Sequence, residues 1–440
     1  MKGQVMPTTM NVANSNGPVE SDHWLICVAG SSPAVVTETL YCLKDRENFP
    51  NKVVIFTTLH GKGQIEKQGL KQQVSNLCRD YNLPVISGAK IEVRIVTNSA
   101  GVELEDIRTS EHQEAMADFL TRQIREITHP RGKGKKRPDS IHASLAGGRK
   151  SMSFYMGNIF SFFASANDEL SHVLVEPGYE VPGFWYPKPE PFNITVKSYA
   201  TGDVTGVLDA SKAEIELSTI PFVQLSNALV STDSDAFHNL SYQQLVDIYQ
   251  VTLDPSRIKL TFNIKNLSVD LNGRVLPIRN FDSYLLYYLV ARDSHENSFS
   301  YQKEVFGNKE HALTQALWQL MGEVTGIRDF ESLIGNSWEA PAEYVEKYIA
   351  RLKQENPDLI PLHQSPKLFS SLSKDGVISE KSIERMMTDI RKALEQTEGR
   401  PTVNVCKVAT LKEDGEERKA AKGVDAYLGL LLPAHQIQLI

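Results

Sequence analysis

The sequence predicts an α/β protein: a Rossmann-like domain with a parallel sheet, followed by an α+β domain of winged-helix type. In the first half, apolar runs of strand length alternate with amphipathic helical stretches. Glycine-containing turns follow two of these runs, as in sheets that bind ligands beyond their strand ends. In the second half, short segments alternate apolar with polar residues before further helices. At 440 residues and 41% hydrophobic content, the chain is long enough for two or three packed domains.

The first strand, residues 24–29, is a continuous apolar run, which is typical of a strand buried on both faces. A helix over residues 34–43 follows it. The same alternation predicts four more strands and three more helices. The strands are at 53–57, 91–96, 141–145 and 173–175, and the helices are at 64–81, 111–128 and 150–166. Repeated β-α units of this length imply a parallel sheet with right-handed crossovers. We expect this domain to span residues 22–200, after a polar tail at 1–21.

The second half begins with residues 201–257, which are polar and turn-rich and which we interpret as a connector. A C-terminal domain over 258–440 follows. Its expected elements are strands at 260–264, 268–271 and 275–277, helices from about 280 and over 311–321, 341–354 and 379–395, and a hairpin from 403–411 and 427–432. An Asn-Gly turn at 272–273 joins two of these strands. A small sheet, then helices, then a hairpin is the order of a winged helix-turn-helix domain.

Composition excludes several classes of function. A net charge of −7 disfavours bulk binding of long nucleic acid, although it leaves room for a local basic pocket. Cys27, Cys42, Cys78 and Cys406 form no CxxC pair, so we expect no zinc site, disulfide framework, metal or other cofactor. Residues 1–21 lack the apolar core of a signal peptide, and no run is long enough for a membrane span. We therefore expect a soluble, cytoplasmic protein with no membrane partner.

Two glycine-containing loops form the candidate site, each after a predicted strand and before a helix. The first loop comprises Gly30, Ser31, Ser32 and Pro33, and the second comprises Gly147, Gly148, Arg149, Lys150 and Ser151, with Met152 next in the helix. Glycine lets backbone N–H groups approach an anion, and a helix N-terminus favours negative charge. If the two strands are neighbours at the switch point, the loops face each other and fit a phosphodiester.

Neither loop has a known nucleotide fingerprint. The first lacks the G-x-G-x-x-G pattern and the second lacks the Walker A pattern, which disfavours NAD binding and NTP hydrolysis. Taken alone, each loop is as well explained by a tight turn with an exposed cation. Asn98 and Ser99 follow the third strand and either line the same groove or cap a turn. Glu176 and Gly178 follow the fifth strand, where they are placed to close one side.

The runs WLICVAGSSPAVVTETL, SLAGGRKSM and VEPGYEVPGFWYP resemble the CARF domains of CRISPR-associated proteins, particularly the type with a Gly-Gly-Arg-Lys loop. This resemblance covers about residues 23–188, and GVDAYLGLLLP near the end is similar to the winged-helix tail of some members. It implies a homodimer that binds a cyclic oligoadenylate, usually cyclic tetra-adenylate, in a two-fold groove above the strand ends. That messenger is made by type III CRISPR complexes during phage infection. Some members, the ring nucleases, also cleave it.

In ring nucleases a serine after the first strand and a lysine in the second loop assist cutting, which implies catalytic roles here for Ser31 or Ser32 and for Lys150. The chemistry needs no protein nucleophile or metal, because the 2′-hydroxyl of the RNA attacks its own phosphorus. Lys150 and Arg149 would neutralise charge that develops on the phosphate. The products would end in a 2′,3′-cyclic phosphate. Without a general base of matched pKa, we expect slow turnover.

Three functions remain open, of which we favour a ring nuclease that switches off antiviral signalling. The second is a ligand-gated transcriptional regulator, and the third is a sensor with an unidentified C-terminal effector. DNA is a possible but disfavoured partner, because the predicted recognition helix at 379–395 carries nearly balanced charge and the predicted wing at 412–418 is acidic. Four adenylates suit a compact two-fold groove, and six remain an alternative.

Overall fold

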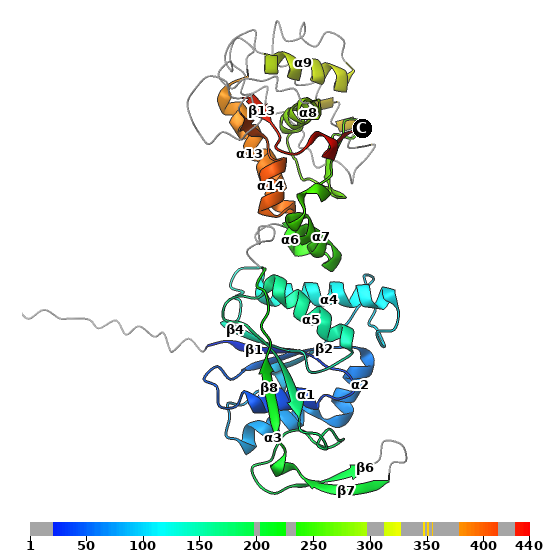
Figure 1. The fold of residues 1–440 in the computed structure, drawn as a ribbon, viewed down its shortest axis with the longest axis vertical. Helices are drawn as coiled ribbons and strands as arrows, with labels where there is room; N and C mark the ends of the chain where they lie inside the picture. The colour runs from blue at the N-terminus through cyan, green and yellow to red at the C-terminus, as the bar shows by residue number, and fades with distance from the viewer. Residues whose placement is uncertain are drawn as a thin grey trace, which may run out of the picture. The chain divides into compact units, whose positions relative to one another are not determined.

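The chain forms two compact units, residues 1–226 and 227–440 (Figure 1). The computed structural model describes residues 21–197, 203–225, 235–296, 312–326, 378–411 and 427–440, with a few positions between 346 and 354. Among these described residues, no helix has the length and apolar character needed to cross a membrane.

The first unit is built on a six-stranded, mostly parallel sheet. Its strands are β1 (His23–Val28), β2 (Lys52–Thr57), β3 (Ile91–Ile95), β4 (Ser140–Ser144), β5 (Glu169–Val175) and β8 (Ile215–Thr219). They lie in the order β3-β2-β1-β4-β5-β8, and only β8 runs antiparallel to its neighbour. The chain therefore reverses its direction of winding between β1 and β4, which is the switch point of a Rossmann-like sheet. The α/β prediction is confirmed.

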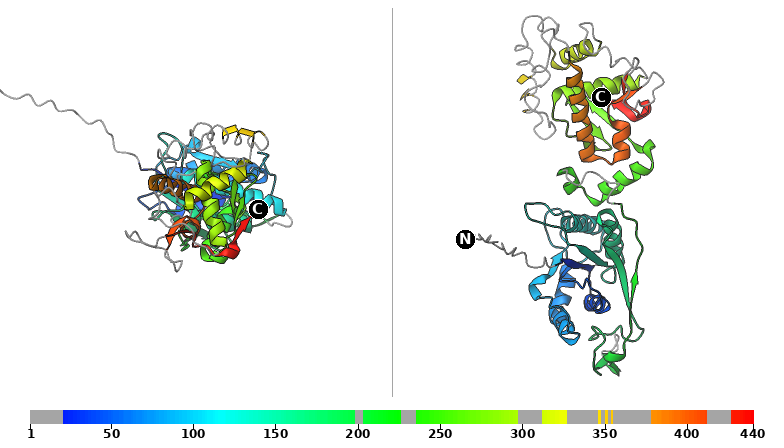
Figure 2. Two further views of the ribbon diagram at one scale, coloured as in Figure 1. Left: turned by 90° about the horizontal axis from the view of Figure 1, so that it is seen from above. Right: turned by 90° about the vertical axis from the view of Figure 1, so that its left-hand side faces the viewer.

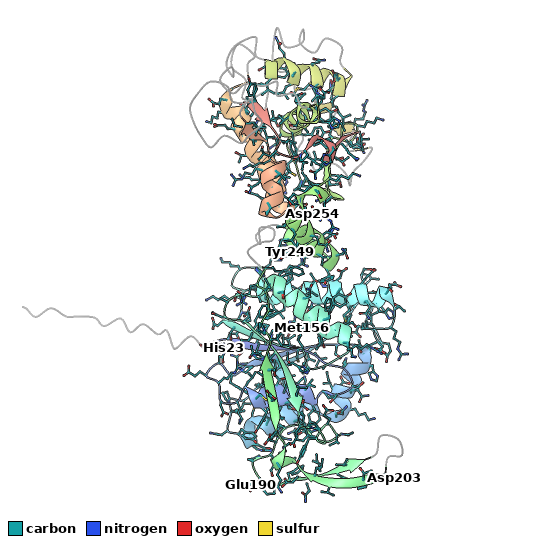
Figure 3. All side chains as sticks on the ribbon, viewed as in Figure 1. His23, Met156, Glu190, Asp203, Tyr249 and Asp254 are labelled. Carbon is teal, nitrogen blue, oxygen red and sulfur yellow. The ribbon has the colours of Figure 1, made fainter. Side chains whose placement is uncertain are left out.

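Helices cover both faces of this sheet. They are α1 (Ala34–Cys42), α2 (Leu59–Gln68) and α3 (Leu70–Asp80), together with α4 (Ser110–Thr128) and α5 (Lys150–Phe163). Figures 1 and 2 show α4 and α5 on one face, and α1 and α3 on the other. Alternate residues of β1 enter the two cores: Leu25 and Cys27 pack with α1 and α3, while Ile26 is fully buried on the opposite side. Met156 of α5 is also fully buried (Figure 3).

One helix predicted over 64–81 is instead two, α2 and α3. Gly69 separates them with a φ of 71°, a left-handed conformation that ends α2. Its backbone N–H still donates to the carbonyls of α2, so the break is a regular helix end. Both helices keep an apolar face toward the sheet, and for this reason the sequence pattern appears continuous across the break.

The segment that we expected to be a connector, 201–257, contributes regular elements. It contains β8, and also β7 (Val204–Asp209), which pairs with β6 (Asn193–Lys197) in a separate ribbon marked by Glu190 and Asp203 in Figure 3. Two helices of the second unit, α6 (Asp235–Asn239) and α7 (Tyr242–Leu253), also lie in it. In β8 only Ile215 and Leu217 alternate with exposed residues, a signal too short to distinguish an edge strand from a loop.

The second unit has a small mixed sheet in the order β11-β10-β9-β14. Its strands are β9 (Leu260–Asn263), β10 (Ser268–Leu271), β11 (Arg274–Val275) and β14 (Ile437–Leu439). Asn272 and Gly273 both have positive φ and form the predicted turn. Against this sheet lies α8 (Phe281–His295), most of whose residues are buried, and α13 (Glu380–Thr397) packs on α8. A further helix, α9 (Ala312–Thr325), contacts α8 as well.

The C-terminal hairpin is shorter than predicted. Only β12 (Ala409–Leu411) and β13 (Tyr427–Gly429) pair, because residues Arg400–Cys406 form helix α14. Val403 and Cys406 are both buried and stand three residues apart, which is helical rather than strand spacing. The predicted turn at 412–418 and most of the predicted helix at 341–354 lie outside the described residues. The winged-helix assignment stays a prediction.

Candidate functional site

The two glycine loops meet at the carboxyl edge of the sheet. They follow β1 and β4, which are paired neighbours. A Cβ added to Gly30 would lie 3.2 Å from the Cα of Gly148, and one added to Gly147 would lie 2.2 Å from the carbonyl oxygen of Val28. Gly148 also has a φ of 77°. These glycines therefore allow a backbone approach that side chains would block.

The helices that begin at these loops have uncapped N-termini. Neither Pro33, before α1, nor Arg149, before α5, accepts a hydrogen bond with its side chain. By contrast, Thr58 accepts from the backbone N–H of Gly61 at the start of α2, and Thr109 caps α4 in the same way. The N–H groups of Val36 and Met152 donate to the carbonyls of Pro33 and Arg149. The first two N–H groups of each helix have no acceptor among the described residues, which suits them to bind an anion.

Arg149 is held in place by a carboxylate that sequence reasoning missed. Its Nε donates to Oδ1 of Asp106 over 2.8 Å, and its Nη2 donates to Oδ2 of the same side chain. Arg108 adds a third bond, from Nε to Oδ2, at 2.9 Å. The bonds from Arg149 hold the pKa of Asp106 well below its usual value. Arg149 remains exposed, so its guanidinium is oriented by Asp106 but still accessible to a ligand.

Lys150 and three hydroxyl groups complete the polar surface of the loops. Lys150 is exposed at the first position of α5 and has no hydrogen-bond or ion-pair partner among the described residues. Ser31 and Ser32 are exposed, and Ser151 is half-buried. This edge therefore combines two cations, hydroxyl groups and two uncapped helix N-termini, the groups expected around a phosphodiester.

Two of the predicted ligand contacts have buried side chains beneath the loops. Met152 is 2% exposed, and a Cβ on Gly148 would lie 3.0 Å from its sulfur. Pro33 is buried as well. Burial of both side chains leaves them to position the loops rather than to contact a ligand. Ser153, which sequence reasoning missed, acts with them because its hydroxyl donates to the carbonyls of Leu145 (2.9 Å) and Gly147 (3.1 Å).

The other predicted residues lie farther along the sheet. Asn98 follows β3, which β2 separates from β1. Its Oδ1 accepts from the backbone N–H groups of Ala100 (3.0 Å) and Val102 (2.9 Å), so its side chain forms a turn, the second of the two alternatives considered. Ser99 is exposed in that turn. Glu176 and Gly178 are exposed after β5, and no hydrogen bond between described residues joins them to either glycine loop.

The segment after β5 packs against α1, and a buried acid lies beside it. The Thr37 hydroxyl donates to the carbonyl of Trp185 over 2.7 Å. The next residue, Glu38, is 7% exposed, and burial together with the nearby charge of Glu180 raises its pKa to about 7. The folded state therefore favours a neutral Glu38.

Replacement of Glu38 by glutamine should stabilise the protein at alkaline pH. Because the pKa of Glu38 is raised in the folded state, its contribution to the free energy of unfolding is fully present below pH 4.5. That contribution is lost as the pH rises through about 7, which lowers the free energy of unfolding by up to about 3 kcal/mol. Urea unfolding at pH 8.5 should show Glu38→Gln more stable than wild type by about 1–3 kcal/mol, with near equality at pH 5. Glu66→Gln, a substitution of an exposed side chain, should change the free energy of unfolding at neither pH. A destabilised Glu38→Gln at pH 8.5 would contradict the raised pKa.

Comparison with known proteins gives one family. The model described as CRISPR-associated protein NE0113 matches residues 32–255, just over half of the 440 residues. The match begins inside the first glycine loop and includes the whole second loop, β8 and α7. No curated protein matches the chain.

Proposed function

Because this chain belongs to the family of CRISPR-associated protein NE0113, we propose that it is a CARF-type sensor of a cyclic oligoadenylate. The ligand, cyclic tetra-adenylate above all, binds where β1 and β4 end. The observation that carries this proposal is the approach of Gly30 to Gly148, which brings two uncapped helix N-termini together. Arg149 and Lys150 stand at one of them, so the edge presents positive charge and N–H donors to a phosphodiester.

The ligand's symmetry favours a homodimer. A ring of four identical nucleotides has a two-fold axis, whereas one chain supplies a single pair of glycine loops. Two chains related by a two-fold axis supply two pairs, and each pair then binds an equivalent phosphodiester on opposite sides of the ring. A hexameric ring has the same two-fold symmetry, so ring size is an outcome of the experiment below.

The same groups support slow cleavage of the ring. The 2′-oxygen attacks the adjacent phosphorus, the bond from phosphorus to the 5′-oxygen breaks, and the product ends in a 2′,3′-cyclic phosphate. Lys150 stabilises charge that builds up on the phosphate, and Arg149, held by Asp106, orients it. Ser31 and Ser32 bind the same group through their hydroxyls. Cleavage removes the messenger and so ends the antiviral signal.

The alternative is a ligand-gated regulator whose output is DNA binding by the second unit. Its predicted recognition helix corresponds to α13, and two arginines of that helix are already paired with carboxylates. Arg385 donates to the buried carboxylate of Asp282, and Nε of Arg391 donates to Glu395 over 2.8 Å. Ile383, Met386 and Ile390 face the core. A helix that reads DNA needs accessible, unpaired cations. Arg385 is paired with a buried carboxylate, and Arg391, although exposed, is paired with Glu395, so these contacts disfavour this alternative.

Incubation of the purified protein with radiolabelled cyclic tetra- and hexa-adenylate in EDTA tests this proposal. We expect conversion of the tetramer to linear products with a cyclic-phosphate end, separated by chromatography. Binding without conversion would make the protein a sensor and move its output to the second unit. Absence of binding to both rings would overturn the CARF proposal.

A further inference from the structure

A histidine lies beside the first glycine loop. His60 is the second residue of α2, which follows β2, and β2 is the neighbour of β1 on the side opposite to β4. Its side chain is exposed, and its Nε2 lies 3.3 Å from the hydroxyl oxygen of Ser31, which is also exposed. Gln68, the last residue of α2, donates through its side-chain amide to the Ser31 carbonyl over 3.0 Å. The imidazole is therefore adjacent to a residue of the candidate site and in contact with solvent.

Backbone bonds fix the position of His60 relative to Arg149. The N–H groups of Leu59 and His60 donate to the carbonyls of Leu104 (3.0 Å) and Glu105 (3.2 Å). The next residue, Asp106, binds Arg149 at the start of α5. His60 and Arg149 are thus attached to adjacent residues, Glu105 and Asp106. Each also borders the place where Gly30 meets Gly148, because His60 contacts Ser31 and Arg149 follows Gly148.

We infer that His60 is the general base for ring cleavage, an inference that rests on the proposed function. Its neutral imidazole takes the proton from the ligand's 2′-hydroxyl while the 2′-oxygen forms its bond to phosphorus. The bond to the 5′-oxygen breaks, and that oxygen takes a proton from solvent. His60 then returns its proton to solvent, so the linear product is an isomer of the ring. Ser31 orients the imidazole through its hydrogen bond to Nε2. When the ligand binds, its 2′-hydroxyl replaces the Ser31 hydroxyl as the partner of Nε2.

A histidine fits the role of general base better than the other side chains that contact the two loops. Among the described side chains that hydrogen-bond to the two loops, Gln68 and Ser153 carry no group that titrates near neutral pH. Asp106 has a carboxyl group, but the bonds from Arg149 hold its pKa well below the usual value, and its oxygens already accept three bonds from arginines. Histidine exchanges protons between pH 5 and 8. From the sequence we expect slow turnover because no general base is apparent. His60 as the base removes that reason.

Single-turnover cleavage of cyclic tetra-adenylate between pH 5 and 8.5 tests this inference. The wild-type rate should rise across the range in which imidazoles lose a proton. In His60→Gln the rate at pH 7.5 should fall about 100-fold or more, and the rise with pH should disappear. Ring binding, measured separately by filter retention, should stay within about threefold, because the backbone N–H that anchors residue 60 is retained.

Two variants complete the experiment. His112→Gln removes a partly exposed histidine that accepts from the backbone of Arg108 near α4, and it should keep both rate and profile. Ser31→Ala should lower the rate but keep the rise with pH, because the base is still present. If wild type cleaves and His60→Gln keeps the same rate and profile, or loses ring binding, the role of His60 is wrong and cleavage stands. If the wild-type protein binds the ring but does not cleave it at any pH, both the proposed cleavage and the role of His60 as its base are wrong.

Discussion

Lys150→Ala should lose about 100- to 1,000-fold in the rate of ring cleavage, the cost typical of removing one group that stabilises transition-state charge. Lys150 is exposed, has no partner among the described residues and begins α5, so its ammonium is available to the phosphate. The uncapped helix N-termini and Arg149 remain in this variant. Affinity for cyclic tetra-adenylate should therefore fall by no more than about tenfold, since one exposed ion pair contributes little to binding. Rates and affinities are measured on radiolabelled ring in EDTA.

Lys67→Ala is the matched control for this variant. Lys67 is an exposed lysine in the last turn of α2, in the same unit but at the opposite end of that helix from His60. Its loss removes one positive charge from the surface and should leave the cleavage rate unchanged. Equal cleavage by wild type and Lys150→Ala would show that charge at this position plays no part in the chemistry.

Gly147→Ala should strongly weaken ring binding and destabilise the first unit. The new Cβ would lie 2.2 Å from the Val28 carbonyl oxygen, 3.0 Å from a methyl of Val35 and 3.2 Å from the Cα of Ala29. Two of these atoms belong to the backbone at the end of β1, which cannot shift as a side chain can. The second glycine loop must therefore move away from β1. Overpacking of this kind costs about 1–3 kcal/mol, measured by urea unfolding. Because movement separates the two helix N-termini, we expect affinity for the ring to drop by more than about 30-fold.

Gly63→Ala is the corresponding control. Gly63 lies in the interior of α2, and an added Cβ would meet no atom within 4 Å. Alanine should stabilise that helix by about 0.5–1 kcal/mol and leave ring binding intact. If Gly147→Ala binds the ring as well as wild type does, the close approach of the loops is not required for recognition.

The sheet of the first unit could be predicted because its central strands are buried on both faces. In β1 and β2 most side chains are buried, including every one in the C-terminal four residues of each strand, so each contains an unbroken apolar run. The elements that could not be predicted have weaker local patterns. β8 is a half-exposed edge strand, and α14 consists of seven residues whose two buried apolar positions, Val403 and Cys406, fit within one helical turn. The parallel pairing of β14 with β9 joins residues far apart in sequence.

The candidate site was predicted in part for the same reason. Glycines, hydroxyls and cations within one loop are visible in a sequence, and the pairing of β1 with β4 brings the two loops together as expected. Asp106 and His60 could not be found in this way, because each reaches the loops from another β-α unit of the sheet. Their contacts depend on the order of strands in the sheet and on the bonds of residues 104–106. The burial of Met152 could not be predicted either, because loop membership does not reveal which way a side chain points.

The most direct test of ligand recognition is a calorimetric titration of cyclic tetra-adenylate into the purified protein in EDTA. We expect saturable binding of one ring for every two chains, and an affinity for Gly147→Ala lower by more than about 30-fold. Absence of heat with wild type, confirmed by failure to retain labelled ring on a filter, would contradict the assignment of this sheet edge as a cyclic oligoadenylate site.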